Sequence, residues 1–274
     1  MPHHEEVTEV ASPVHTRLLL LHGFFAGKAA WDRVRMDMRG EGIDILAPDL
    51  LGYGDHRHAH ARGDYSLDRI VEHLAPTVER LRPTHVVGHS MGGMVALGLD
   101  RLLPYTFSRI GIIGLPVFAD ARDGKSHQEL RGRRYRIFMR THGFSHYGCG
   151  VVHATRQAWK PFAHHFAPRQ PESIFMCVFD HSREAHLAGL TSIAFGGLVP
   201  RLAEGATAPV AMLHGLRDRT APADRAQSVA EGMGWDFETA ERANHQVIVE
   251  RPLLVADWIR RKVLDTPPPI TSGR

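Results

Sequence analysis

Cysteine is scarce in this chain, whose 274 residues include only Cys149 and Cys177. Two cysteines could form at most one bridge, and their spacing resembles neither a disulfide framework nor a CxxC metal site. We therefore expect both to be reduced thiols.

Long apolar runs are absent as well. Runs such as Leu18 to Leu21 have the length of a buried strand, whereas a membrane helix needs about 18 or more apolar residues. The segment Met1 to Glu9 carries histidines and acids where a secretory signal carries basic residues and then an apolar stretch. The sequence therefore predicts no membrane span, no membrane partner and a cytoplasmic location.

Charge of one sign is not concentrated enough to indicate a nucleic-acid partner. The formal net charge is +3 with the 20 histidines counted as neutral, which falls short of the basic stripe typical of nucleic-acid binding. The exception is residues 121–140, which hold seven basic and two acidic side chains. Such a stretch is usually a solvated face.

What the chain has is enough apolar material, 43% of its residues, for one large core. Short apolar runs alternate with stretches of helical spacing, which predicts an α/β fold: a mostly parallel twisted sheet with helices on both faces. Four consecutive leucines lack in/out alternation, as expected of a strand covered on both sides. The predicted strands are Leu18 to Leu21, Ile43 to Ala47, His85 to Val87, Arg109 to Ile113, Pro209 to Leu213 and Asp236 to Thr239.

Helices are predicted between these strands. One begins after Ser66, a candidate N-cap, another follows Ser90, and the last begins at Pro252, a favoured first-turn residue. Roughly 90 residues between the fourth and fifth strands contain no clear strand, and they are read as a helical insertion because structureless loops of that length are rare. We expect a core formed by residues 1–115 and 201–266, a cap insertion over 116–200 and a flexible tail over 267–274.

The most informative segment is Gly88-His89-Ser90-Met91-Gly92, which follows an apolar strand and precedes an apolar helix. This Gly-x-Ser-x-Gly pattern is typical of a nucleophile elbow, where a side chain at either glycine would meet backbone. Ser90 is then presented to a cleft as a nucleophile. The N–H of Met91, at the start of the helix, is free to stabilise an oxyanion.

A serine nucleophile requires a histidine base and an acid that orients it. Asp218 lies in the loop beyond the fifth strand and His245 in the last loop before the last helix, so the order Ser, Asp, His matches this kind of triad. Asp120, which follows the fourth strand, is an alternative acid.

With these motifs the chain resembles the α/β-hydrolase superfamily, and the resemblance extends from Leu18 to about Leu264. Besides the elbow, the similar motifs are Leu20-Leu21-His22-Gly23-Phe24, the turn Asp49-x-x-Gly52-Tyr53-Gly54, and the frame of His245, Glu250 and Pro252. The resemblance implies that the backbone N–H of Phe24 is the second oxyanion donor beside Met91, with Phe25 as the fallback.

The resulting expectation is a serine hydrolase that cleaves a carboxylic ester of a small molecule through an acyl-enzyme on Ser90. His245 would move the proton and Asp218 would orient the imidazole. No metal or organic cofactor is required. The alternatives are a lactonase, a thioesterase, hydroxynitrile-lyase-like or acyl-transfer chemistry, and a ligand-sensing protein with little turnover.

The insertion should determine the substrate. Its aromatic residues Phe138, Phe144 and Trp159, together with Phe25, are candidate substrate-binding residues. The basic stretch Arg131 to Arg140 has a second interpretation besides a solvated face, as a docking surface for an anionic substrate or an acidic carrier that delivers an acyl group.

The other histidines and both cysteines are predicted to be structural or surface residues without a part in the chemistry. The run His56-Arg57-His58-Ala59-His60 could suggest a metal site, but no cysteine or carboxylate has matching ligand spacing, and a polar loop is favoured. His22 and His89 are expected to support the loop backbone at strand ends. Neither cysteine lies in an elbow, so Ser90 is the stronger nucleophile.

Overall fold

A computed structural model describes residues 16–57, 64–130, 155, 158, 177 and 180–265, and these form a six-stranded sheet in the order β2-β1-β3-β4-β5-β6. Every neighbouring pair is parallel. The strands are β1 (Arg17–Leu21), β2 (Asp44–Leu46), β3 (His85–His89), β4 (Arg109–Ile113), β5 (Val210–Gly215) and β6 (Asp236–Ala240). The predicted α/β class and all six predicted strands are confirmed, and β3 and β5 each extend two residues further than expected.

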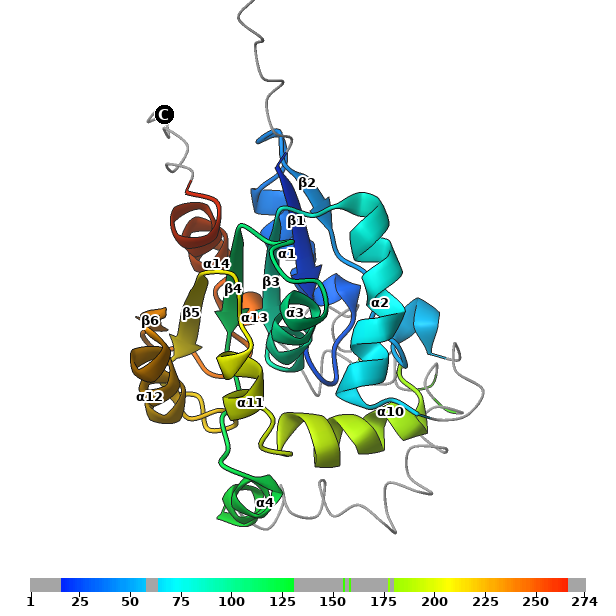
Figure 1. Cartoon of the computed structure of the whole chain (residues 1–274), viewed down its shortest axis with the longest axis vertical. Helices are drawn as coiled ribbons and strands as arrows, with labels where there is room; N and C mark the ends of the chain where they lie inside the picture. Colours follow the sequence, from blue (N-terminus) through cyan, green and yellow to red (C-terminus); the bar gives the residue numbers. More distant parts are fainter. Residues whose placement is uncertain are drawn as a thin grey trace, which may run out of the picture.

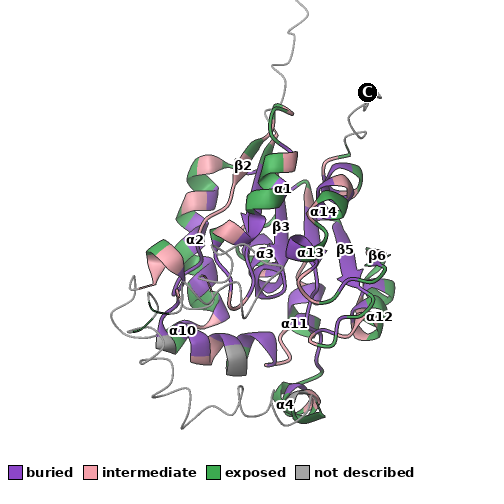
Figure 2. Ribbon diagram, turned by 180° about the vertical axis from the view of Figure 1, so that it is seen from behind, coloured by how far each residue is buried: buried purple, intermediate pink, exposed green. Residues whose placement is uncertain are grey.

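The leucine run of β1 explains why the sheet needs covering on both faces. Leu19 and Leu21 belong to one core cluster, Leu18 and Leu20 to the other, and all four are fully buried. Successive side chains of a strand point to opposite faces, so an unbroken apolar strand supplies both cores. The edge strands β2 and β6 are partly exposed (Figure 2).

Two sets of helices cover these faces. Residues of α2 (Leu67–Leu81), α3 (Met91–Leu102), α11 (Val199–Glu204) and α12 (Ala223–Met233) contribute to the first core. Residues of α1 (Asp32–Asp37), α13 (Val247–Glu250), α14 (Pro252–Trp258) and the π-helical turn η5 (Ile259–Val263) contribute to the second. Short 3₁₀ turns, η1 (Lys28–Trp31) and η2 (Gly54–His56), lie in the loops after β1 and β2.

The three predicted helix starts are confirmed, and only the capping bond expected of Ser66 is missing. This residue occupies the N-cap position of α2, but its hydroxyl makes no capping bond. Its own N–H instead donates to the Asp64 carboxylate at 3.1 Å. The last helix starts at Pro252 as expected, and η5 continues it.

Three helical segments lie wholly within the described part of the predicted insertion. They are α4 (Ala121–Leu130), α10 (Arg183–Ala188) and the π-helical segment η4 (Gly189–Ala194), and Figure 1 shows α4 and α10 beyond the arrowhead ends of the strands. Because active sites of parallel sheets form at the carboxyl ends of strands, these helices lie on the functional side of the sheet. Within the described ranges, no helix is long and apolar enough to cross a membrane. The residues of the predicted tail lie outside those ranges.

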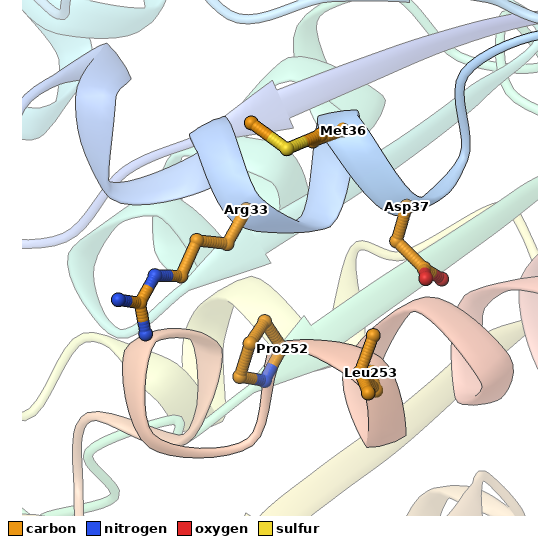
Figure 3. A pocket seen from close by; sticks show the side chains of 5 residues that line it. All are labelled: Arg33, Met36, Asp37, Pro252 and Leu253. Carbon is orange, nitrogen blue, oxygen red and sulfur yellow. The ribbon is translucent and has the colours of Figure 1, made fainter.

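Arg260 of η5 ties the C-terminal helices to α1 and to the segment that follows α1. Its guanidinium, 5% exposed as a residue, pairs with Asp37 at 2.9 Å and with Glu41 at 2.6 Å. Nearby, α1 and α14 border a surface groove lined by Arg33, Met36, Asp37, Pro252 and Leu253 (Figure 3).

Arg260→Met should lower the free energy of unfolding by about 1–3 kcal/mol, because it leaves two partly buried carboxylates without their partner. Urea denaturation measures this loss. The matched control is Arg261→Met, because Arg261 is 40% exposed in its side chain and pairs with Asp257 on the surface. That control should change stability by less than about 0.5 kcal/mol; equal losses in the two variants would contradict the importance of the buried pairs.

Candidate active site

Ser90 occupies a sharp turn between β3 and α3. Its backbone has φ 53° and ψ −116°, a left-handed conformation that is costly for a residue with a Cβ. The Ser90 N–H donates to the carbonyl of Ile113 in the neighbouring strand at 2.8 Å, which fixes the turn to the sheet. The side chain is thereby held at the carboxyl end of β3.

The two glycines of the elbow are required by close backbone contacts. A Cβ on Gly88 would lie 2.2 Å from the carbonyl oxygen of Gly92, and a Cβ on Gly92 would lie 2.3 Å from that of Leu21. Real Cβ atoms do not approach backbone so closely. The structure thus shows, at both glycines, the close backbone contact that the sequence predicts.

Ser90, His245 and Asp218 form one hydrogen-bonded chain. The Nε2 atom of His245 lies 3.0 Å from Ser90 Oγ, and its Nδ1 lies 2.7 Å from Asp218 Oδ2. Because a carboxylate only accepts, Nδ1 carries the proton in this arrangement and Nε2 is left to accept from the serine hydroxyl. The structure therefore brings together the three residues that sequence reasoning selected from three separate loops.

Asp218 is held as a carboxylate. Its Oδ1 accepts the N–H groups of Thr220 at 2.7 Å and Ala221 at 2.9 Å, while Oδ2 faces His245. Burial by itself would raise the pKa of Asp218, but the hydrogen bonds and the neighbouring imidazole hold it below the ordinary value. The alternative acid, Asp120, instead accepts the N–H of Asp123 in the first turn of α4.

The loop after β1 lies against the elbow. A Cβ on Gly23 would be 3.1 Å from Ser90 Cβ, and the next residue is Phe24. Within the described ranges, the backbone N–H groups of Phe24 and Met91 donate to no protein acceptor. Two uncommitted donors therefore flank the serine. Phe25, the fallback donor, has φ 57°, a strained value that the loop imposes on it.

His22 and Asp49 fix this loop to the one after β2. His22 accepts the Leu50 N–H through Nε2 at 2.9 Å and donates through Nδ1 to the Gly23 carbonyl at 2.9 Å, so it supports the backbone as expected. Asp49 accepts the N–H groups of Lys28 at 2.7 Å and Asp55 at 3.2 Å. The Asp-x-x-Gly-x-Gly turn therefore holds the loops after β1 and β2 together, a role that the sequence did not predict.

Two buried histidines that sequence reasoning did not select border the Phe24 loop. The rings of His181 and His186 stack at 5.1 Å, and the ring of His186 lies 5.3 Å from that of Phe24 and 5.0 Å from that of Phe25. We name His181, His186, Phe24 and Phe25 the ring cluster. No local sequence pattern predicts a role for these two histidines, because they lie near the end of the predicted insertion and only tertiary contacts bring them to the Phe24 loop.

The start of the insertion contacts the loop that carries Asp218. Asp123 of α4 receives two hydrogen bonds from Arg225, at 2.6 and 3.2 Å, and His127 Nε2 donates to the Arg219 carbonyl at 3.0 Å. The end of the insertion contacts the Phe24 loop through the ring cluster. Each described end therefore packs on a loop that bears site residues.

The predicted substrate contacts Phe138, Phe144 and Trp159 and the basic stretch Arg131 to Arg140 lie outside the described residues, as does Cys149. Cys177 is described, and burial raises the pKa of its thiol to about 11, which makes it a poor nucleophile. Among the described residues, no group of three or more histidine, cysteine or acidic side chains is placed to hold a metal. His56 faces His73, with 5.1 Å between ring centroids.

Comparison with known families agrees with this geometry. The profile of the family described as "Alpha/beta hydrolase family" matches residues 18–258, which is most of the chain. The chain belongs to the α/β-hydrolase family. The resemblance drawn from four separated motifs is therefore confirmed.

Individual relatives cover less of the sequence. An esterase of Mycobacterium tuberculosis is 33% identical over 118 residues, which are 42% of this chain and 38% of that protein. A probable lysophospholipase of Arabidopsis thaliana is 30% identical over 117 residues, 40% of this chain and 26% of that protein. The chain thus matches less than two fifths of the length of either curated relative.

The likeness to solved structures extends over nearly the whole chain. An esterase from Thermogutta terrifontis superposes with a TM-score of 0.66 at 20% identity, covering 90% of this chain and 88% of that one. The thioesterase domain of the curacin biosynthetic pathway gives a TM-score of 0.63 at 17% identity, covering 90% and 92%. At these identities the likeness establishes the fold.

Gly88→Ala should destabilise the protein by more than about 3 kcal/mol, because the new Cβ meets the Gly92 carbonyl. Gly232→Ala is the matched control: it lies in α12, where a Cβ would meet nothing within 4 Å. That substitution should instead stabilise the protein by about 0.5–1 kcal/mol. Thermal unfolding measures both variants; a Gly88→Ala protein as stable as the wild type would contradict the tight elbow.

Stability should fall as the pH drops below about 6.5. Burial lowers the pKa of His89 to about 3 and that of His214 to about 4, so both stay neutral in the native state while the unfolded chain takes up protons. One such histidine contributes roughly 1–2 kcal/mol of this loss between pH 6.5 and 5. Urea unfolding at pH 7.5, 6 and 5 measures the slope, and His214→Phe should make it shallower. An unchanged slope in that variant would be inconsistent with a buried neutral His214.

Proposed function

We propose that this protein is a serine hydrolase that cleaves a carboxylic ester through an acyl-enzyme on Ser90. The observation that carries the proposal is the hydrogen-bonded chain from Asp218 through His245 to Ser90, with distances of 2.7 and 3.0 Å. These distances lie within the range that proton transfer requires. The esterases among its relatives and structural neighbours support the same reaction class.

In the first half of the reaction, Ser90 Oγ attacks the ester carbonyl carbon while His245 Nε2 takes the hydroxyl proton. Asp218 accepts the Nδ1–H hydrogen bond and stabilises the resulting imidazolium. The N–H groups of Phe24 and Met91 donate to the oxyanion, each such donor being worth about 3–4 kcal/mol in transition-state stabilisation. The tetrahedral intermediate then collapses, and His245 returns the proton to the departing alcohol oxygen.

In the second half, water hydrolyses the acyl-enzyme. His245 takes a proton from the water as its oxygen attacks the acyl carbon, and the same two N–H groups stabilise the second oxyanion. Collapse breaks the bond to Ser90 Oγ, which recovers its proton from His245, and the free acid leaves. The side chains of Ser90, His245 and Asp218 are sufficient for every proton transfer in these two half-reactions.

We further propose that residues 116–200 form a cap over this site. Its described ends support the assignment, because α4 contacts the loop of Asp218 through His127 and the following helix α12 through Asp123, and α10 contributes His186 to the ring cluster. Phe25 would then face the bound acyl or alcohol group from the core side. The cap residues Phe138, Phe144 and Trp159 remain predicted contacts.

Fluorophosphonate labelling tests the nucleophile. The wild-type protein should be labelled at Ser90, identified by peptide mass, and Ser90→Ala should lose labelling together with roughly 10⁴-fold or more of kcat. A Ser90→Ala variant that hydrolyses esters at the wild-type rate, or a folded wild-type protein that is not labelled, would refute the proposal.

A substrate panel then identifies the preferred acyl chain length and the class of acyl bond. It comprises p-nitrophenyl esters of increasing chain length, a lactone and an acyl thioester, with the free acid quantified as product. Ester cleavage with release of acid supports the proposal. Faster turnover of the thioester or lactone would move the assignment to those classes, and acyl transfer without free acid would exclude hydrolysis.

A further inference from the structure

We propose that His89, the residue before the nucleophile, is a positioning residue that holds the main chain of His245 in place for catalysis. This inference rests on the proposed function. His89 is 1% exposed at the end of β3, and its Nε2 lies 2.8 Å from the carbonyl oxygen of His245. One elbow thus supplies the nucleophile at Ser90 and, one residue earlier, a tether for the base.

The direction of this hydrogen bond fixes the tautomer of His89. A carbonyl oxygen only accepts, so Nε2 carries the hydrogen and donates it, which leaves Nδ1 without a hydrogen. Burial lowers the pKa of His89 to about 3, and the ring therefore stays neutral under working conditions. A neutral tether next to His245 adds no positive charge that would oppose proton uptake by the base.

The loop that carries His245 is also fixed on either side of that residue: the Arg217 N–H donates to the Ala243 carbonyl at 2.9 Å, and the Val249 N–H donates to the Gln246 carbonyl at 2.9 Å. Within the described ranges, the backbone N–H and carbonyl of His245 itself make one hydrogen bond, which is the bond to His89. The preceding residue, Asn244, donates its N–H to the Glu250 carboxylate at 2.8 Å, but that clamp is exposed to solvent. The buried restraint on the catalytic imidazole's own peptide therefore comes from His89.

The second edge of the His89 ring faces the loop after β1. A Cβ on Gly23 would lie 2.8 Å from His89 Nδ1, and this nitrogen has no hydrogen-bond partner among the described residues. The ring also packs on His245, with 5.1 Å between centroids. His89 therefore fills the space between the base and the loop whose Phe24 N–H is the proposed oxyanion donor.

This placement predicts an effect on kcat. The distance from His245 Nε2 to Ser90 Oγ is 3.0 Å, and a displacement of about 1 Å in a reacting group can cost roughly 10²-fold in rate. Substrate binding would be affected little, because His89 is buried behind the triad.

A matched pair of amide variants tests the tether. In His89→Gln the side-chain nitrogen can reach the position of the imidazole Nε2, whereas in His89→Asn the shorter amide reaches only that of Nδ1. We expect His89→Asn to lower kcat and the rate of fluorophosphonate labelling about 10- to 100-fold with KM nearly unchanged. His89→Gln should stay within about fivefold of wild type. Equal loss in both variants, or no loss in either, would overturn the proposal.

A second measurement uses the wild-type protein and does not depend on the variants folding or on catalysis. Nitrogen-15 NMR of the histidine side chains should show His89 as the Nε2–H tautomer, unprotonated at pH 6, with a slowly exchanging ring N–H. An Nδ1–H tautomer or an imidazolium would overturn the tether while leaving the proposed hydrolase function intact. If Ser90 proves not to be a nucleophile but this tautomer is found, the proposed function fails and the hydrogen bond remains as a structural one.

Discussion

The structure depends on a backbone that bends too sharply at Ser90 for an ordinary residue. A left-handed conformation of this kind costs about 1–3 kcal/mol, and the surrounding packing must offset that cost. It does so through the bond from Ser90 to Ile113 in β4 and through direct backbone contact at Gly88 and Gly92. Because these contacts join β3, β4 and the loop after β1, Ser90 occupies one position relative to the whole sheet.

Histidines at strand ends provide a second level of organisation. His22 follows β1, His89 ends β3 and His214 lies near the end of β5, and burial lowers the pKa of all three. His22 joins two loops and His89 reaches the last one, so neutral imidazoles brace the backbone around the site. His245 differs because its ring lies between a carboxylate and a hydroxyl. The role of each of these histidines is thus set by the groups that its ring contacts, and the count of twenty histidines in the composition could not show this.

The sequence was informative wherever local rules determine structure. The buried leucines of β1 predict a strand covered on both faces, and the glycines around Ser90 predict an elbow, because each follows from the conformation of a few adjacent residues. Asp218 and His245 could be found because the carboxyl ends of parallel strands meet at one edge. The ring cluster could not, since His186 reaches Phe24, and His181 reaches Phe25, only through contacts between distant segments. Asp49 was recognised as part of a motif, but its bond to the Lys28 amide requires two loops to be placed together.

The attachment of the predicted insertion at both of its described ends has a consequence for protein engineering. Asp123 and His127 secure α4 to the segment around Arg219 and Arg225, while His186 secures α10 against Phe24. A chimera that receives this segment from another protein of the family would disturb two loops of the candidate site at once unless the anchoring pairs are transplanted with it. Exchange boundaries placed inside α4 and α10, so that these anchors stay with the host, keep the geometry of the candidate site while the intervening sequence is replaced.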